Sequence, residues 1–351
     1  MIYAPIVIPA LNRYEHLRRL LESLSANGWA KYTDVYIALD FPPNEKYMVG
    51  YKQVCGFLDS FDGSCFKNFI VVKRDRNYGV GKNDCDLIEK AIIPFYDRWI
   101  YSEDDLEFSP NFIEYMDKCL ERYADDESVL SICGYSYPVE WNVARGSTAF
   151  LTQATYSAWG TGQWRDKNSV VREDITHRHY LLENMNRAYR DGLVDAMIPG
   201  RRAEYVSYVT LGAGNREMES LTDMALGPYL MLAGKKVVVP VVSKVRNLGF
   251  DGTGANCSSI AAASGKHSMD YDYADQPIDQ SESFELVVDE DEAHLVANHE
   301  AIGDFLFVPA NKRRTEAIGD FLYRTLGFAG CRLGHFAYGI IRSLYRKAKG
   351  R

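Results

Sequence analysis

Three consecutive carboxylates, Glu103, Asp104 and Asp105, follow the short apolar run 99–101. Such a run is typical of a buried strand, and acids at the carboxyl end of a strand in an open α/β sheet lie where these sheets bind ligands. Adjacent carboxylates repel one another, so they need either a nearby cation or full solvation. The triplet therefore predicts a cation site, and the alternative is a solvated acidic turn.

Further candidate residues lie where other predicted strands end. They are found in the turn after the first strand, at the end of the second strand, and in the loop before the third predicted helix. At the carboxyl edge of a sheet, such residues offer close backbone approach and positive charge to phosphates. As isolated turns they have plain structural explanations, but together they predict a nucleotide site. The candidates are Pro9, Ala10, Asn12, Arg13, Asp40, Arg76, Asn77, Gly79 and Lys82.

Strands and helices alternate through the region that carries these candidates, which predicts an α/β fold built on a mostly parallel central sheet flanked by helices. The predicted strands cover residues 2–8, 35–39, 69–73, 99–101, 128–134 and 235–242. The predicted helices cover residues 14–25, 51–61, 82–93, 110–123 and 220–233.

Composition excludes several classes of protein. The net charge of -8 over 351 residues argues against a general nucleic-acid binder. Seven scattered cysteines without a CxxC spacing fit free thiols in a reducing compartment. The sequence opens on a strand rather than a signal peptide and holds no long apolar run, so we expect a cytoplasmic protein that does not span a membrane.

The sequence divides into three predicted regions: residues 1–262 as the α/β domain, 263–311 as an acidic linker or peripheral segment, and 312–351 as basic amphipathic helices. Residues 312–351 hold ten Lys or Arg against two acids, giving a net charge of +8, which leaves a net charge of -16 for residues 1–311.

A near-repeat, 300–307 and 316–323, suggests paired short helices. The basic tail predicts attachment to an anionic membrane surface, such as the inner face of the plasma membrane, and the alternative is docking on the acidic body.

The ordered segments IVIPALNRYEHLRRLLESL, YIALD, RNYGVGK and IYSEDDLEFSPNFIEYM resemble the GT-A fold glycosyltransferases, with the last most similar to N-acetylglucosaminyltransferase I and its bacterial relatives. The resemblance covers residues 2 to about 257 and implies a Rossmann-like GT-A domain with a C-terminal helical extension. It also implies that Asp105 binds Mn²⁺ or Mg²⁺, while Glu103 and Asp104 hold ribose, sugar or metal-bound water. A hard cation with oxygen ligands suits that assignment.

The same resemblance assigns further roles. It implies that Trp159, Gly160 and Trp164 lie beside the donor sugar and the acceptor, although Trp164 could equally be a core residue. It places the catalytic base at Asp223, with Glu219 and Glu217 as alternatives; a capping role for Asp223 is the competing interpretation. The glycine-rich stretch 247–254 resembles the family's loop that closes over the donor.

These assignments imply a metal-dependent, inverting glycosyltransferase. Its donor would be a nucleotide sugar, UDP-linked, carrying GlcNAc or a related hexose. Its acceptor would be a saccharide, for instance a lipid-linked oligosaccharide of cell-surface polysaccharide synthesis. The alternatives are a sugar-nucleotide nucleotidyltransferase, whose glycine-rich basic signature is missing from residues 9–13, and a non-catalytic protein that binds nucleotide sugars or glycans.

Overall fold

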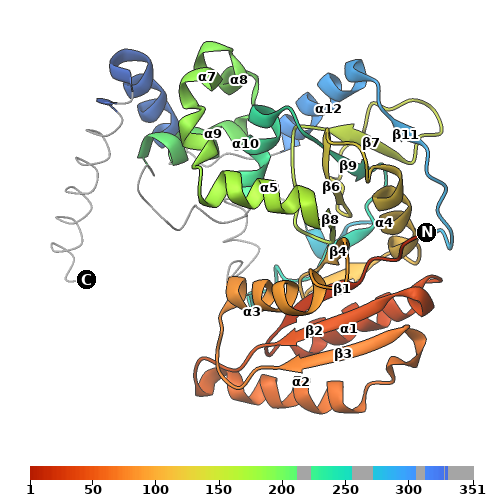
Figure 1. The fold of residues 1–351 in the computed structure, drawn as a ribbon. Helices are drawn as coiled ribbons and strands as arrows, with labels where there is room; N and C mark the ends of the chain where they lie inside the picture. Colours follow the sequence, from red (N-terminus) through yellow and green to blue (C-terminus); the bar gives the residue numbers. More distant parts are fainter. Residues whose placement is uncertain (212–222, 255–271, 306–312, 328, 331–351) are drawn as a thin grey trace.

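The computed structural model describes residues 1–211, 223–254, 272–305, 313–327 and 329–330 (Figure 1). Within these residues the centre is a nine-stranded sheet in the order β11-β7-β9-β6-β8-β4-β1-β2-β3. Its strands are β1 (Ile6–Ala10), β2 (Asp34–Leu39), β3 (Asn68–Lys73), β4 (Arg98–Tyr101), β6 (Val129–Cys133), β7 (Ala149–Thr152), β8 (Thr161–Trp164), β9 (Lys236–Pro240) and β11 (Val288–Asp289). Most neighbouring pairs are parallel, the exceptions being β4–β8, β6–β8 and β7–β9. The prediction of a mostly parallel α/β sheet is confirmed.

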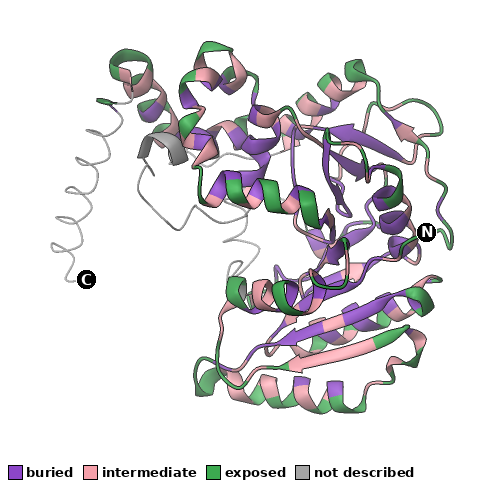
Figure 2. Cartoon of the chain, in the orientation of Figure 1, coloured by how far each residue is buried: buried purple, intermediate pink, exposed green. Residues whose placement is uncertain are grey.

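The first half of the sheet matches the predicted alternation of strands and helices. Helix α1 (Tyr14–Ser25) has the predicted bounds, and its leucine stripe, residues 17, 20, 21 and 24, is fully buried. Figure 2 shows β1 and β2 buried along their length, whereas the edge strand β3 is only partly covered. The other helices here are α2 (Met48–Ser60), α3 (Val80–Leu87) and α4 (Phe112–Arg122).

Strand β8 inserts antiparallel between β4 and β6, with Tyr101 opposite Thr161. Because the two strands run in opposite directions, residues that follow Tyr101 and residues that precede Thr161 extend past the same edge of the sheet. The pairing therefore directs Trp159 and Gly160 toward the acidic triplet. The sequence did not predict this strand.

A separate two-stranded sheet supports the triplet from its other side. Strand β5 (Leu106–Phe108), which directly follows Asp105, pairs antiparallel with β10 (Val245–Asn247), and Leu106 lies opposite Asn247. The glycine-rich stretch that begins at residue 247 is therefore held beside the triplet by backbone hydrogen bonds.

A group of helices packs beside the second half of the sheet around a second hydrophobic core (Figure 1). It comprises α5 (Arg165–Thr176), α6 (Tyr180–Glu183), α7 (Met185–Arg190), α8 (Leu193–Ala196), α9 (Pro199–Leu211) and α10 (Asp223–Ala233). Next to this group, residues 313–327 form one of the predicted C-terminal helices, whereas residues 331–351 lie outside the described part. Among the helices that the structure describes, none is long and apolar enough to cross a membrane.

Residues 272–305, the described part of the predicted linker or peripheral segment 263–311, pack against the domain. Residues 288–289 add β11 to the sheet, and α12 (Glu292–Phe305) follows, carrying residues 300–305 of the near-repeat. Both Tyr273 and Phe284 are buried. Several acids of this segment have partners distant in sequence. Asp289, for example, accepts hydrogen bonds from the Ala144 backbone N–H at 2.8 Å and pairs with His294 at 2.7 Å.

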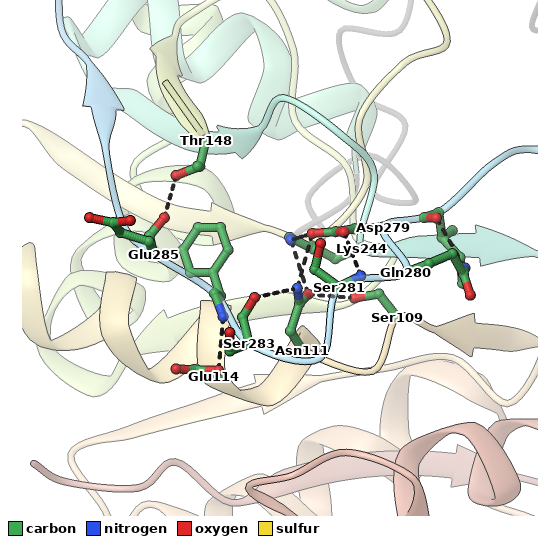
Figure 3. Close-up of polar contacts among 12 residues, drawn as sticks. Ser109, Asn111, Glu114, Thr148, Lys244, Asp279, Gln280, Ser281, Ser283 and Glu285 are labelled. Atoms are coloured by element: carbon green, nitrogen blue, oxygen red, sulfur yellow. Dashed lines mark hydrogen bonds and ion pairs between the residues drawn. The ribbon is translucent and has the colours of Figure 1, made fainter. Parts of the chain in front are cut away.

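A buried ion pair anchors the segment 276–285 to the body (Figure 3). The ammonium of Lys244, whose side chain is 2% exposed, contacts the carboxylate of Asp279 and donates to Asn111 Oδ1 at 3.0 Å. The Asn111 amide donates in turn to Asp279 at 3.0 Å and to the Ser283 carbonyl at 3.2 Å. The charge of the buried Lys244 is thus compensated by Asp279, which lies outside the predicted α/β domain 1–262.

Replacing Asp279 by alanine should lower the free energy of unfolding by about 3–5 kcal/mol, because it leaves a buried ammonium without its counter-ion. Burial opposes ionisation of Asp279, but hydrogen bonds from Asn111 and Lys244 outweigh it and lower the pKa of this carboxyl below its ordinary value of 3.8. Its stabilising contribution should therefore be complete above pH 3.8 and be lost as the pH falls through the lower folded-state pKa. Urea unfolding at several pH values measures both effects. Glu282→Ala, at an exposed acid of the same segment, should change stability little.

Candidate active site at the carboxyl edge of the sheet

The acidic triplet is not a solvated turn. Strand β4 ends at Tyr101, and the turn before β5 carries Glu103, Asp104 and Asp105. Asp104 is 8% exposed and Asp105 is 6% exposed, while Glu103 is half-buried. Three carboxylates with so little access to water require positive charge or hydrogen-bond donors.

The guanidinium of Arg13, from the turn after β1, supplies part of that charge. It contacts both carboxylate oxygens of Asp104, and its Nη1 donates to Asp105 Oδ2 at 2.8 Å. Burial opposes the charged guanidinium, but the two carboxylates outweigh burial and raise the pKa of Arg13. The other oxygen of Asp105, Oδ1, is buried and has no hydrogen-bond partner among the described residues. One arginine therefore leaves an excess of negative charge and an open acceptor at this site.

Glu103 connects the triplet electrostatically to the predicted base. Burial first, and then the charges of Asp105, Asp223 and Asp104, raise the pKa of Glu103 to about 8. Asp223 is the first residue of α10, so the start of this helix brings a fourth carboxylate near the triplet. Glu219 and Glu217, the alternative bases, lie outside the described residues.

The glycine-rich stretch that begins at residue 247 packs directly against Asp105. The Leu248 N–H donates to the backbone carbonyl of Asp105 at 2.8 Å. A Cβ placed on Gly249 would lie 1.9 Å from Asp105 Oδ2, so only glycine allows this approach. His16, on α1, holds the same stretch through contacts of 3.2 Å with the Leu248 carbonyl and 3.3 Å with Asp251.

Replacing Gly249 by alanine should displace either this stretch or the Asp105 side chain, because no room exists for the added methyl group. We expect a loss of about 1–3 kcal/mol in the free energy of unfolding, as for other overpacked sites, together with weaker binding of the nucleotide that the sequence predicts. Thermal unfolding and calorimetric titration with nucleotide measure the two effects. Gly56→Ala is the matched control, since its Cβ would meet nothing within 4 Å and helix α2 should gain from alanine. Equal behaviour of the two variants would contradict the close approach.

Among the residues predicted to bind nucleotide, Asp40 is hydrogen-bonded to the loop before α3. Its carboxylate accepts hydrogen bonds from the N–H groups of Tyr78 at 2.8 Å and Gly79 at 2.9 Å, and from the Asn77 amide at 3.0 Å. Asp40 and Asn77 therefore shape the loop before α3. Gly79 adopts a φ of +80° there, a conformation that favours glycine.

The cations of this loop lie on its surface. The exposed side chains of Arg76 and Lys82 lie 5.7 Å and 5.3 Å from the centre of the Tyr78 ring. They leave a positively charged surface at the start of α3. Of the remaining candidates, Pro9 and Ala10 lie in β1 itself, and the Asn12 backbone is covered by Gly50 of α2.

Trp159 lies in an aromatic cluster with residues that the sequence did not single out. Its ring centre is 4.7 Å from that of Tyr135, 5.7 Å from Phe250 and 5.6 Å from Tyr273. Phe250 belongs to the stretch that reaches Asp105, and Tyr273 comes from the segment first interpreted as a linker. No spacing in the sequence signals these partners. Beside this cluster, Gly160 adopts a φ of +65°.

Trp164 lies away from that cluster. It is buried in the hydrophobic core that also contains the leucine stripe of α1, and its indole N–H donates to the Leu120 carbonyl at 3.1 Å. This placement favours the interpretation of Trp164 as a core residue over a contact with the acceptor.

No protein-family model matches the chain, and no curated protein sequence matches it at a significant level. Among solved structures, Staphylococcus aureus TarS 1–349 in complex with UDP is 13% identical, over 68% of this chain and 57% of that one, with a TM-score of 0.35. The structure of TarS 1–349 alone is matched over 50% of each chain, at 14% identity and a TM-score of 0.32. A Pyrobaculum calidifontis mannosyltransferase in complex with GDP-Man and Mn²⁺ is 11% identical, over 99% of this chain and 82% of that one, with a TM-score of 0.36. The matches to TarS 1–349 span only part of that chain, and similarity this weak defines no family, so the function must be argued from the site.

Proposed function

We propose that the chain is a metal-dependent glycosyltransferase that moves a sugar from a nucleotide donor to a saccharide acceptor. The observation that carries the proposal is the pair of buried carboxylates, Asp104 and Asp105, at the carboxyl edge of β4. They lie between a turn that contributes Arg13 and a stretch that requires Gly249. The carboxyl edge of an open α/β sheet is where nucleotides bind in such folds.

The residues at the triplet fit a divalent cation. Among the described residues, no three His, Cys, Asp or Glu side chains form a complete ligand set. Mg²⁺, however, is commonly bound by one or two carboxylates, and the remaining ligands are water and substrate phosphate. Asp105, with its buried acceptor Oδ1, would hold Mn²⁺ or Mg²⁺, and Asp104 and Glu103 would support the ribose, sugar or metal-bound water. The cation would neutralise charge on the departing diphosphate.

The donor's phosphates also need cations from the protein. Arg13 already faces the triplet, and Arg76 and Lys82 lie at the start of α3. A guanidinium pairs with phosphate as readily as with carboxylate. We assign these three side chains to the donor, which we expect to be UDP-linked.

Asp223 acts as the base that accepts the proton of the acceptor hydroxyl. Its electrostatic effect on Glu103 supports its presence at the same site. With one base and no protein nucleophile, the acceptor oxygen displaces the diphosphate in a single step, which inverts the anomeric centre. Trp159 and Gly160 flank the sugar, where an aromatic face suits the apolar side of a sugar ring. A lipid-linked glycan of a polysaccharide pathway is the acceptor we propose.

A donor screen tests this function. The full chain is incubated with UDP-, GDP-, dTDP- and CMP-linked sugars, with and without Mn²⁺, and the released products are identified. Transfer predicts release of a nucleoside diphosphate, or of CMP from CMP-linked sugars, that requires both metal and protein. Release of pyrophosphate would indicate a nucleotidyltransferase instead, and binding without any product would indicate a non-catalytic protein.

A further inference from the structure

Helix 313–327 has an unusual distribution of polar and apolar side chains. Several of its polar residues face the body: Glu316 pairs with Arg202 at 3.0 Å, and Arg324 pairs with Asp195 at 2.8 Å. Tyr323 stacks on Tyr189 with ring centres 4.0 Å apart. The helix therefore docks on α7–α9 through charges and one aromatic pair rather than through an apolar stripe.

Its apolar residues face outward. Ile318 is 57% exposed, Phe321 65% and Leu326 57%, so several of the largest exposed hydrophobic side chains of the described residues lie on this one helix. At about 100° per residue Ile318 and Phe321 lie roughly opposite Glu316, Asp320 and Tyr323, whereas Leu326 lies at the border between the two faces. An amphipathic helix of a soluble protein normally buries its apolar face, so this one is reversed relative to the body.

The acids and the exposed cations of helix 313–327 determine the charge of this face. The two acids of the region 312–351 are Glu316 and Asp320. Both are engaged, because Asp320 pairs with Arg202 at 3.5 Å and with Arg324 at 2.9 Å. Arg313 and Arg314, at the start of the helix, are exposed. The outward surface therefore combines apolar side chains with cations and presents no acid within the described residues of this helix.

We propose that the outward face of helix 313–327, formed by Ile318 and Phe321 with Arg314, binds an anionic lipid surface. Apolar side chains flanked by cations are what an interfacial helix needs: the former enter the boundary between headgroups and acyl chains, and the latter attract anionic headgroups. A second copy of this chain would have to match the same positive charge, which disfavours self-association through this face. The body's net charge of -16 over residues 1–311 would be repelled by such a membrane, so attachment would hold the protein by this helix.

Vesicle flotation with the full chain, without donor or metal, tests the proposal independently of the enzyme's chemistry. The wild type should float with vesicles of phosphatidylcholine and phosphatidylglycerol in equal amounts, and much less with phosphatidylcholine alone. Ile318→Asn with Phe321→Ser should weaken partition at least about tenfold. Arg314→Gln should weaken it about fivefold and reduce its sensitivity to salt.

Phe95→Ser is the matched control, because Phe95 is 76% exposed elsewhere on the surface. It should float like the wild type. Unchanged partition of the Ile318/Phe321 variant would overturn the proposal. A lower melting temperature for that variant without vesicles would also overturn it, because another part of the chain would then cover the face. A dimer seen in sedimentation and dissociated by the two substitutions would overturn it as well.

Discussion

Replacing Asp105 by asparagine should abolish the metal-dependent part of donor binding while leaving the fold intact. Asparagine keeps the size of the side chain and can still accept the hydrogen bond that Arg13 now donates to Asp105 Oδ2 at 2.8 Å. It loses the negative charge that a hard cation requires. We expect the affinity for UDP in the presence of Mn²⁺ to fall at least about a hundredfold, since a bound cation contributes several kcal/mol. Calorimetric titration with and without Mn²⁺ measures the difference.

Glu107→Gln is the matched control for this substitution. Glu107 lies two residues further on, in β5, and pairs with Arg246 at 2.7 Å on the neighbouring strand. Its replacement should cost little stability and leave donor binding unchanged. If Asp105→Asn bound UDP with Mn²⁺ as the wild type does, the assignment of Asp105 to the metal would be wrong.

Replacing Asp223 by asparagine should reduce kcat by about a hundredfold to ten-thousandfold, the range expected for loss of a general base. Donor affinity should stay within a small factor, because Asp223 is assigned to the acceptor hydroxyl. The same substitution removes one of the charges that raise the pKa of Glu103, so that pKa should fall. Steady-state kinetics and NMR titration of the carboxyl groups provide the two measurements.

Asp191→Asn serves as the control, because Asp191 pairs with its neighbour Arg190 in exposed positions of the helical group. It should retain full turnover. A wild-type kcat in the Asp223 variant would exclude Asp223 as the base, and Glu219→Gln would then be the next substitution to measure.

The sequence predicted what depends on local patterns. The apolar runs of β1, β2 and β3 and the leucine stripe of α1 repeat over a few residues, so their types and approximate bounds could be predicted. The triplet's position at the end of β4 followed from the same reasoning. The burial of the triplet could not be predicted in the same way. It depends on the turn after β1 and on the stretch after β10, which lie about ninety and about one hundred and forty residues away.

What the sequence could not predict depends on pairs of distant residues. Antiparallel β8 and the β5–β10 pair bring Trp159 and Gly249 to the triplet, yet both are short and carry no alternating pattern. Asp40 was predicted to bind nucleotide, but its hydrogen bonds to Tyr78 and Gly79 become apparent only when the loop is folded. The acidic composition of the segment that contains Tyr273 and Asp279 gave no sign that Asp279 pairs with the buried Lys244.

The anchoring of residues 276–285 also affects how the chain can fold during synthesis. Asp279 and Phe284 contact Asn111 and Glu114, which are separated from them by 168 and 170 positions. Contacts of such long range form late, because the ends of a long loop must first meet. Until about residue 290 has left the ribosome, the nascent body would hold an uncompensated Lys244 in its core and an incomplete sheet edge at β7. The α/β domain is therefore complete only when its C-terminal segment has been added, although most of the side chains that we propose for the reaction, such as Arg13 and Asp105, lie in its first half.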